Sequence, residues 1–273
     1  MTTLAIPARR LRLVKYLAIA NVSLRQRLRD RLVLGARVAF LALVMFVYAR
    51  LWRELLPGHA AGASAPSAVE SVWYLAITEW VVIGQPRLHL SIERDVRSGD
   101  LAYQLNRPMS YLTFKLAEAI GELAASMLTL GCAGALFAYL FAGGFPTDPR
   151  GLWWALPLGL IAAVLTMLWH ALIGLSSFWL TDCNPIYLVW QKSMFVLGGL
   201  FVPLALYPEW LLGLARWTPF PVLIHGPGSM AFGSDPALAL HTLGLLMLWS
   251  AVAVVLLSVV YRRGLKSVEL HGG

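Results

Sequence analysis

Charged residues are scarce in this sequence, and their scarcity excludes an ordinary soluble domain. Asp, Glu, Lys and Arg make up 13% of the 273 residues, whereas 59% of the residues are hydrophobic. A soluble domain of this length would carry about 25% charged residues. The low charge and the mean hydropathy of +0.69 therefore indicate a protein that lies in a lipid bilayer.

Residues that hold metals, cofactors or nucleotides are also lacking. No Cys/His cluster has zinc-site spacing and no H-E-x-x-H pair occurs among the six histidines. The sequence has no G-x-x-x-x-G-K-[ST] loop, so it cannot hydrolyse ATP through a loop of that kind. The two cysteines, Cys132 and Cys183, are expected at opposite membrane depths and hence not in a disulfide. We expect neither a cofactor nor a metal in this chain.

Long apolar segments dominate what is present. About 17 to 25 apolar residues cross the hydrocarbon core as a helix. Six segments meet this description, namely 33–53, 69–86, 112–141, 152–180, 187–206 and 237–260. The sequence therefore predicts an all-α polytopic membrane protein with six transmembrane helices. Its permease domain is expected at 33–261, between an N-terminal helix within 1–32 and a tail at 262–273.

The distribution of basic residues predicts the orientation. If the N-terminus is cytoplasmic, 17 of the 22 Lys and Arg residues fall on cytoplasmic segments. The positive-inside rule therefore places both termini in the cytoplasm. The net charge of +8 follows from this topology, so it predicts contact with membrane lipid and not with nucleic acid.

Residues 7–31 have the pattern of a basic amphipathic helix. Its apolar face would carry Leu11, Val14, Leu17, Ala18, Asn21, Leu24 and Leu28, with Arg12, Lys15 and other basic residues elsewhere. Such a helix lies in the membrane interface. Its apolar face would meet acyl chains or a partner protein, or the helix serves only as a basic anchor.

The loop 87–110 is a compact charged block between two apolar segments, and nothing in it suits hydrocarbon. We predict that it is a water-exposed docking surface. Its notable residues are Glu93, Arg94, Asp95, Arg97, Gly99, Asp100, Arg107 and Pro108.

Three polar residues are expected at membrane depth, where ionisable groups are costly unless paired or in a cavity. Arg37 and Glu79 lie about 6 and 9 Å inside their spans at 1.5 Å per residue, so they are candidates for an ion pair. Such a pair would fix helix packing or act in substrate passage. His170 is either a hydrogen-bonded packing residue or a ligand. An ion-coupled secondary transporter or channel would use Glu79 and His170.

Two further features bear on function. A membrane-embedded serine protease would need Ser176 with His225 or His241, but those histidines are predicted near the opposite face of the membrane. The segment 204–236 is apolar yet rich in Pro and Gly, so we expect short external or re-entrant helices there.

Four stretches together resemble the permease subunits of type 2 ATP-binding-cassette (ABC) exporters, in their bacterial six-span branch. They are IERDVRSGDLAYQLNRPMS at 92–110, SSFWLTD at 176–182, GGLFVPLALYPEWLLGLARWTPF at 198–220 and YRRGLKSVELHGG at 261–273. Each stretch alone is weak, and their order and spacing carry the resemblance. Arg37 and Glu79 depart from the family pattern.

The resemblance implies a non-catalytic permease of the bacterial cytoplasmic (inner) membrane. It would pair with a second permease, either the same chain or a sister, and with two copies of an ABC ATPase that binds ATP and Mg. The N-terminal helix and the loop 92–108 would contact that ATPase, which assigns coupling roles to Arg12, Lys15 and the eight residues of the charged block.

The same resemblance places the cargo pathway between the two permeases, chiefly along spans two and five. Phe195, Leu197, Phe201 and Val202 are candidates for an apolar plug, with ordinary helix packing as the alternative. The implied cargo is an amphiphilic drug, peptide, lipid or natural product.

Overall fold

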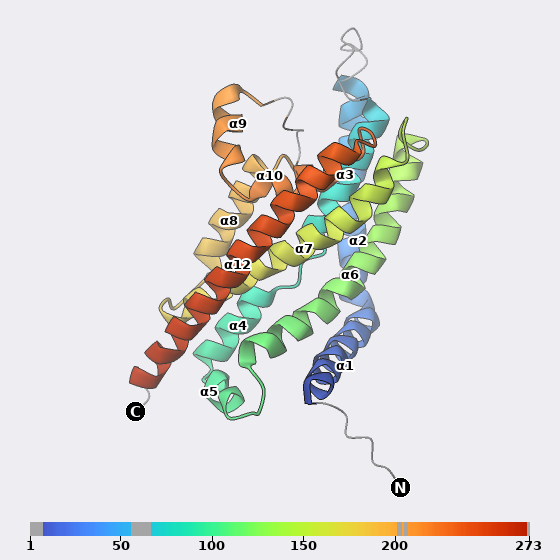
Figure 1. Cartoon of the computed structure of the whole chain (residues 1–273). Helices are drawn as coiled ribbons and strands as arrows, with labels where there is room; N and C mark the ends of the chain where they lie inside the picture. The colour runs from blue at the N-terminus through green and yellow to red at the C-terminus, as the bar shows by residue number, and fades with distance from the viewer. Residues whose placement is uncertain (1–7, 56–66, 201–203, 205–206, 272–273) are drawn as a thin grey trace.

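Every regular element in the described part of the chain is a helix. The computed structural model describes residues 8–55, 67–200, 204 and 207–271 (Figure 1). An all-helical fold was predicted from the apolar runs, and it is confirmed for these residues.

Four helices are long and apolar enough to cross a membrane. They correspond to the predicted first, third, fourth and sixth spans: α2 (Arg31–Leu55), α6 (Tyr111–Ala142), α7 (Gly151–Leu175) and α12 (Pro236–His271). The short 3-10 helix η1 (Ser176–Phe178) extends α7. The chain is therefore a membrane protein with at least these four candidate spans.

The predicted second and fifth spans are shorter than expected. Helix α3 (Ala68–Ile83) has 16 residues and helix α8 (Asn184–Leu197) has 14. At 1.5 Å per residue they extend about 24 and 21 Å, less than the ~30 Å hydrocarbon core. Pro86 follows α3 and the Gly198–Gly199 pair follows α8, and both sequences favour ending a helix. Six spans thus remain a prediction.

Helix α3 lies at the centre of the bundle, with residues 71–81 all buried. It begins with a capping box in which Ser67 and Glu70 satisfy each other's backbone N–H groups. Glycines let the neighbouring helices approach its large side chains. A Cβ at Gly159 of α7 would lie 2.6 Å from the ring of Trp80, and one at Gly131 of α6 would lie 3.0 Å from the indole nitrogen.

Different helices lie at the two ends of the bundle. Helices α1 (Ala8–Arg29), α4 (Leu88–Arg97) and α5 (Asp100–Leu105) lie near both termini, at what we call the α4 end (Figure 1). The segment 204–236 lies at the opposite end, which we call the α9 end. It contains three short helices, α9 (Glu209–Arg216), α10 (Phe220–Leu223) and α11 (His225–Ser229). Helix α11 packs against α3 and α7, and residues 226–229 are buried.

Helix α1 packs along α6, but not through its apolar face. Gly121 of α6 allows the contact, since a Cβ there would lie 2.0 Å from the backbone oxygen of Ala20. Ser23 is buried on the same side, whereas Val14 and Leu17 are 61% and 60% exposed. The predicted apolar face is therefore left open to lipid or a partner, and small residues form the contact inside the protein.

Candidate functional site

The charged block folds into two short helices at the α4 end. Helix α4 ends near Ser98, and α5 starts directly after Gly99, whose φ of 79° lies in the left-handed region that glycine adopts without strain. After α5 the chain passes Pro108 and enters α6 at Tyr111. This path places the whole block on two helices supported by the start of α6.

Asp95 points into the protein and forms a buried polar network with α6. Its carboxylate lies 2.8 Å from the Lys115 ammonium and accepts hydrogen bonds from Tyr111 at 3.0 Å and Gln104 at 3.2 Å. Lys115 also donates to the hydroxyl of Ser91 at 2.9 Å. This network ties α4 and α5 to the first turns of α6.

Glu93 also points inward and ties α4 to the segment after α7. The Cys183 thiol and backbone N–H donate to its carboxylate at 2.9 and 3.3 Å, and Arg97 donates at 3.0 Å. The thiol hydrogen bond is the largest cause that holds the pKa of Glu93 below its usual value. Burial, followed by the hydrogen bond to Glu93, raises the pKa of the Cys183 thiol to about 12.

The structure therefore divides the predicted docking residues into two groups. Glu93 and Asp95 are buried and hold the helices in place, so they are not surface contacts as expected. The exposed group consists of Arg94, Arg97, Gly99, Asp100, Arg107 and Pro108. We call these exposed residues, together with Tyr103 and Leu105, the α4–α5 surface.

Sequence reasoning missed the apolar part of this surface. Tyr103 is 71% exposed, and the Arg107 guanidinium lies 5.6 Å from its ring centroid. Leu105 is also exposed. Large apolar side chains between exposed arginines are typical of protein interfaces, and their place between Asp100 and Arg107 in the sequence was the available signal.

An aromatic stack joins α4 to α7 and α8. The His89 ring stacks on Tyr187 with 3.8 Å between centroids, and His170 packs edge-on against both rings. Burial lowers the pKa of His89 to about 4, so its ring is neutral at pH 7. His170 is thus a buried packing residue beside α4. The fourth-span residue Ser176 donates to Ile173 O, and His225 of α11 lies beside Tyr74 of α3, so Ser176 and His225 do not form a pair.

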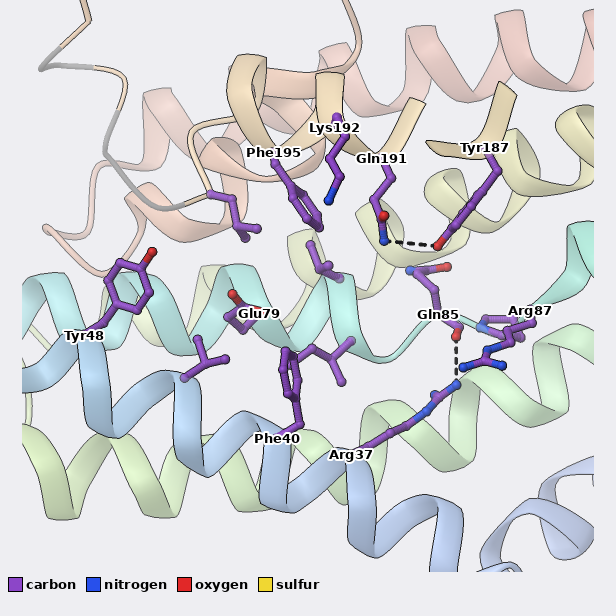
Figure 2. A pocket seen from close by; sticks show the side chains of 15 residues that line it. Arg37, Phe40, Tyr48, Glu79, Gln85, Arg87, Tyr187, Gln191, Lys192 and Phe195 are labelled. Atoms are coloured by element: carbon purple, nitrogen blue, oxygen red, sulfur yellow. Dashed lines mark hydrogen bonds between the residues drawn. The ribbon is translucent and has the colours of Figure 1, made fainter. Parts of the chain in front are cut away.

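A large polar cavity opens between α2, α3 and α8. Its volume is about 610 Å³. Figure 2 shows charged, amide and aromatic side chains around it, namely Arg37, Phe40, Tyr48, Glu79, Gln85, Arg87, Tyr187, Gln191, Lys192 and Phe195. We call it the α2–α8 cavity.

The predicted Arg37–Glu79 ion pair is not found in this structure. Arg37 instead donates to the backbone oxygen of Gln85 and to the hydroxyl of Ser126, both at 3.2 Å (Figure 2). Glu79 lies six residues, or about 9 Å, before Gln85 along α3. Among the described residues no ion pair or hydrogen bond engages the carboxylate of Glu79, which is 4% exposed and lines the cavity.

The predicted pathway residues lie in different places. Both Phe195 and Leu197 pack against the hydrophobic core, and Phe195 also lines the α2–α8 cavity. Phe201 and Val202 lie outside the described residues. Of the two N-terminal coupling candidates, Lys15 is exposed on α1, and the side chain of Arg12 lies outside the described part of the chain.

Comparison with known protein families supplies the identification. Residues 69–272 match the sequence profile described as ABC-2 family transporter protein. The chain belongs to the ABC-2 transporter family. It is thus an ABC transporter permease, the membrane component of a transport system. A comparison with curated proteins gives no significant match.

The matched range covers most of the site but not all of it. The α4–α5 surface, Glu79, His170 and Phe195 fall within it, whereas Lys15 and Arg37 precede it. The charged block at 87–110 thus lies within the part of the chain that matches the family. Membership also implies association with an ABC ATPase.

The hydrogen bond between Glu93 and Cys183 predicts an unreactive thiol. In a Cys132→Ser background Cys183 is the sole thiol of the permease. With the pKa raised to about 12, its thiolate fraction at neutral pH is roughly a thousandfold below that of an ordinary thiol. We expect slow alkylation by N-ethylmaleimide, and a rate about tenfold higher or more in Glu93→Ala, which removes both the acceptor and the negative charge.

The matched control for this measurement is Glu118→Ala. Glu118 is an acid on α6 at the same end, and its ion pair is with Lys115, at 3.5 Å. Equal alkylation rates in Glu93→Ala and Glu118→Ala would contradict the assigned role of Glu93.

Proposed function

We propose that this permease is the transmembrane subunit of an exporter that a separate ABC ATPase drives from the cytoplasm. The α4 end would face the cytoplasm, in agreement with the predicted location of 17 of the 22 basic residues. The absence of a phosphate loop from the sequence means that the energy of ATP has to enter through another chain. The membrane would be the bacterial cytoplasmic membrane.

One observation carries the proposal. The exposed charged surface is formed by α4 and α5, and buried contacts hold these two helices against the rest of the bundle. The α4–α5 surface is connected to α6 through Asp95, to Cys183 at the start of α8 through Glu93, and to α8 itself through His89. A rigid connection of this kind conveys a rigid-body motion of a docked partner to the membrane helices. We assign the surface to the ATPase, with the exposed Lys15 of α1 as a further contact.

A second permease subunit, the same chain or a sister, would cover the α2–α8 cavity. The two helices α2 and α8, which both line the cavity, carry exposed apolar side chains, among them Phe40 and Val47 on α2 and Val189 and Val196 on α8. Charged and aromatic groups inside the cavity suit a cargo with one polar and one apolar part. The cargo would therefore be an amphiphilic drug, peptide, lipid or natural product.

Affinity purification of the tagged permease from membranes of its host tests this function. We expect a complex that contains a chain with a phosphate loop, in two copies for each pair of permeases, and that hydrolyses ATP. A permease that purifies without such a chain and transports with an ion gradient alone would contradict the proposal.

The Glu79 carboxylate, which has no ion pair or hydrogen bond within the described part of the chain, favours one alternative, an ion-coupled transporter or channel in which this carboxylate takes up the ion. His170 would not share that site, because it lies beside His89 and Tyr187 and not among the residues that line the cavity. Transport that collapses with a proton ionophore while ATP is held constant would support this alternative. ATP-dependent transport that survives the ionophore would exclude it.

Glu79→Gln is expected to stabilise the permease while impairing its transport. A buried carboxylate with no partner, as Glu79 is among the described residues, costs free energy, and the neutral amide has the same shape. We expect a gain of about 1 kcal/mol, which shifts the unfolding midpoint in detergent upward by roughly 2–4 °C. The exposed acid Glu209, changed to Gln, serves as the control. A lower midpoint for Glu79→Gln would show that the carboxylate is paired.

A further inference from the structure

A second cavity at the α4 end gathers three arginines from separate segments. Arg27 comes from α1, Arg37 from α2 and Arg87 from the link between α3 and α4. The cavity has a volume of about 500 Å³, and Glu122 of α6 is the single acid among its lining residues. We call it the arginine cavity. Three positive charges against one negative charge give it a net charge of +2.

Most of the hydrogen-bond donors of these arginines are unused. A guanidinium has five N–H donors. Arg37 uses two of its nitrogens, on Gln85 and Ser126. Among the described residues the guanidinium groups of Arg27 and Arg87 make no hydrogen bond and no ion pair, and the Nε atom of Arg27 is buried without a partner.

The positive charges of the three arginines repel one another. An anion bound between them would offset this repulsion and stabilise the arrangement. Phosphate oxygens suit guanidinium groups best, because two parallel N–H···O bonds form at once. In Figure 2 the side chains of Arg37 and Arg87 converge beside Gln85, at the edge where the arginine cavity adjoins the α2–α8 cavity. The shared chemistry is therefore that of a phosphate group.

The position of the cavity distinguishes a lipid from a free phosphate. Arg27 lies just before the span that begins at Arg31, and Arg37 lies six residues, or about 9 Å, into it. This depth is that of lipid headgroups and the adjoining ends of acyl chains. Phe40 and Ile83 form an apolar wall of the same cavity. The Phe40 side chain is also 54% exposed on the outside of α2.

We propose that the arginine cavity binds the phosphate headgroup of an anionic phospholipid from the leaflet at the α4 end. Arg27 and Arg87 hold the phosphate, and one acyl chain lies along Phe40 of α2. Helix α1, α2 and the α3–α4 link are thereby joined through the lipid. The site adjoins the α2–α8 cavity and shares Arg37, Phe40 and Arg87 with it, and its occupation does not depend on the ATPase.

Native mass spectrometry of the purified permease, delipidated and titrated with phosphatidylglycerol, tests the site. We expect one lipid per chain to bind more tightly than phosphatidylcholine, and an affinity at least about tenfold lower in the double variant Arg27→Gln/Arg87→Gln. The matched control is Arg25→Gln/Arg29→Gln, which removes two exposed arginines of the same helix α1. Equal losses in the two double variants would overturn the proposal, since they would show attraction to surface charge alone.

Two more arms complete the test. Glu122→Gln removes the single acid of the cavity and is expected to tighten phosphatidylglycerol binding severalfold, a gain that a misfolded variant would not give. Millimolar inorganic phosphate is expected to compete poorly. Full displacement of the lipid by inorganic phosphate, or weaker binding in Glu122→Gln, would overturn the assignment to a phospholipid. None of these outcomes depends on the proposed function, because the permease is measured without an ATPase.

Discussion

Replacing Lys115 with methionine is expected to lower the free energy of unfolding by about 3 kcal/mol. The Lys115 ammonium is buried between Asp95, at 2.8 Å, and the hydroxyl of Ser91, at 2.9 Å. Methionine keeps most of the apolar stem but leaves the Asp95 carboxylate buried without its cation. Chemical unfolding in detergent measures the loss of stability. Tryptic cleavage near Arg97 measures whether α4 detaches before the rest of the protein unfolds.

Two controls separate the buried pair from a general effect of lost charge. The double variant Lys115→Met/Asp95→Asn removes both charges and is expected to recover a large part of the loss. Lys15→Met removes an exposed lysine of α1 and is expected to change stability by less than about 0.5 kcal/mol. If Lys115→Met unfolds no more readily than Lys15→Met, the network does not hold α4 in place.

The sequence predicted the helical fold and the unit that forms the charged surface. Apolar runs between charged breaks indicate membrane helices without reference to tertiary contacts, and α2, α6, α7 and α12 follow them closely. Helices α3 and α8 also overlap predicted apolar segments, but they are shorter than those segments, because Pro86 and the Gly198–Gly199 pair favour ending a helix. Family membership followed from short motifs around the same breaks.

The division of the charged block into buried and exposed residues was beyond sequence reasoning. Glu93 and Asp95 look as water-exposed as Arg94 in a linear reading. Their burial depends on donors that come from elsewhere in the chain, the Cys183 thiol 90 positions away and the Lys115 ammonium. The packing of α4 against α6 and α7 is needed to see that the buried carboxylates of Glu93 and Asp95 have hydrogen-bond and ion-pair partners.

The partners of membrane arginines were unpredictable for a related reason. Depth along two helices brings Arg37 and Glu79 to similar levels, but rotation and tilt decide which groups meet. Arg37 turns to the free carbonyl of Gln85 at the end of α3, where the helix leaves backbone oxygens without intrahelical partners. Arg37 thus lies in the arginine cavity, and Glu79 has no ion pair or hydrogen bond among the residues that the structure describes.

Charge reversal on the α4–α5 surface is expected to abolish association with the ATPase. The side chains of Arg94 and Arg107 are exposed and make no hydrogen bond or ion pair among the described residues, so Arg94→Glu/Arg107→Glu leaves the buried network intact. Reversing two charges of an interface replaces attraction by repulsion, which typically costs several kcal/mol. We expect the amount of ATPase that co-purifies to fall at least about tenfold.

The measurement that tests the central claim most directly compares this variant with a charge-matched one at the opposite end. Arg150→Glu/Arg216→Glu also reverses two exposed arginines, both at the α9 end. Each permease is purified from host membranes, and the co-purified chain with a phosphate loop is quantified together with its ATP hydrolysis. The account predicts that Arg94→Glu/Arg107→Glu loses this chain and the activity while Arg150→Glu/Arg216→Glu keeps both. Full retention in the first variant, or equal loss in the two, would contradict it.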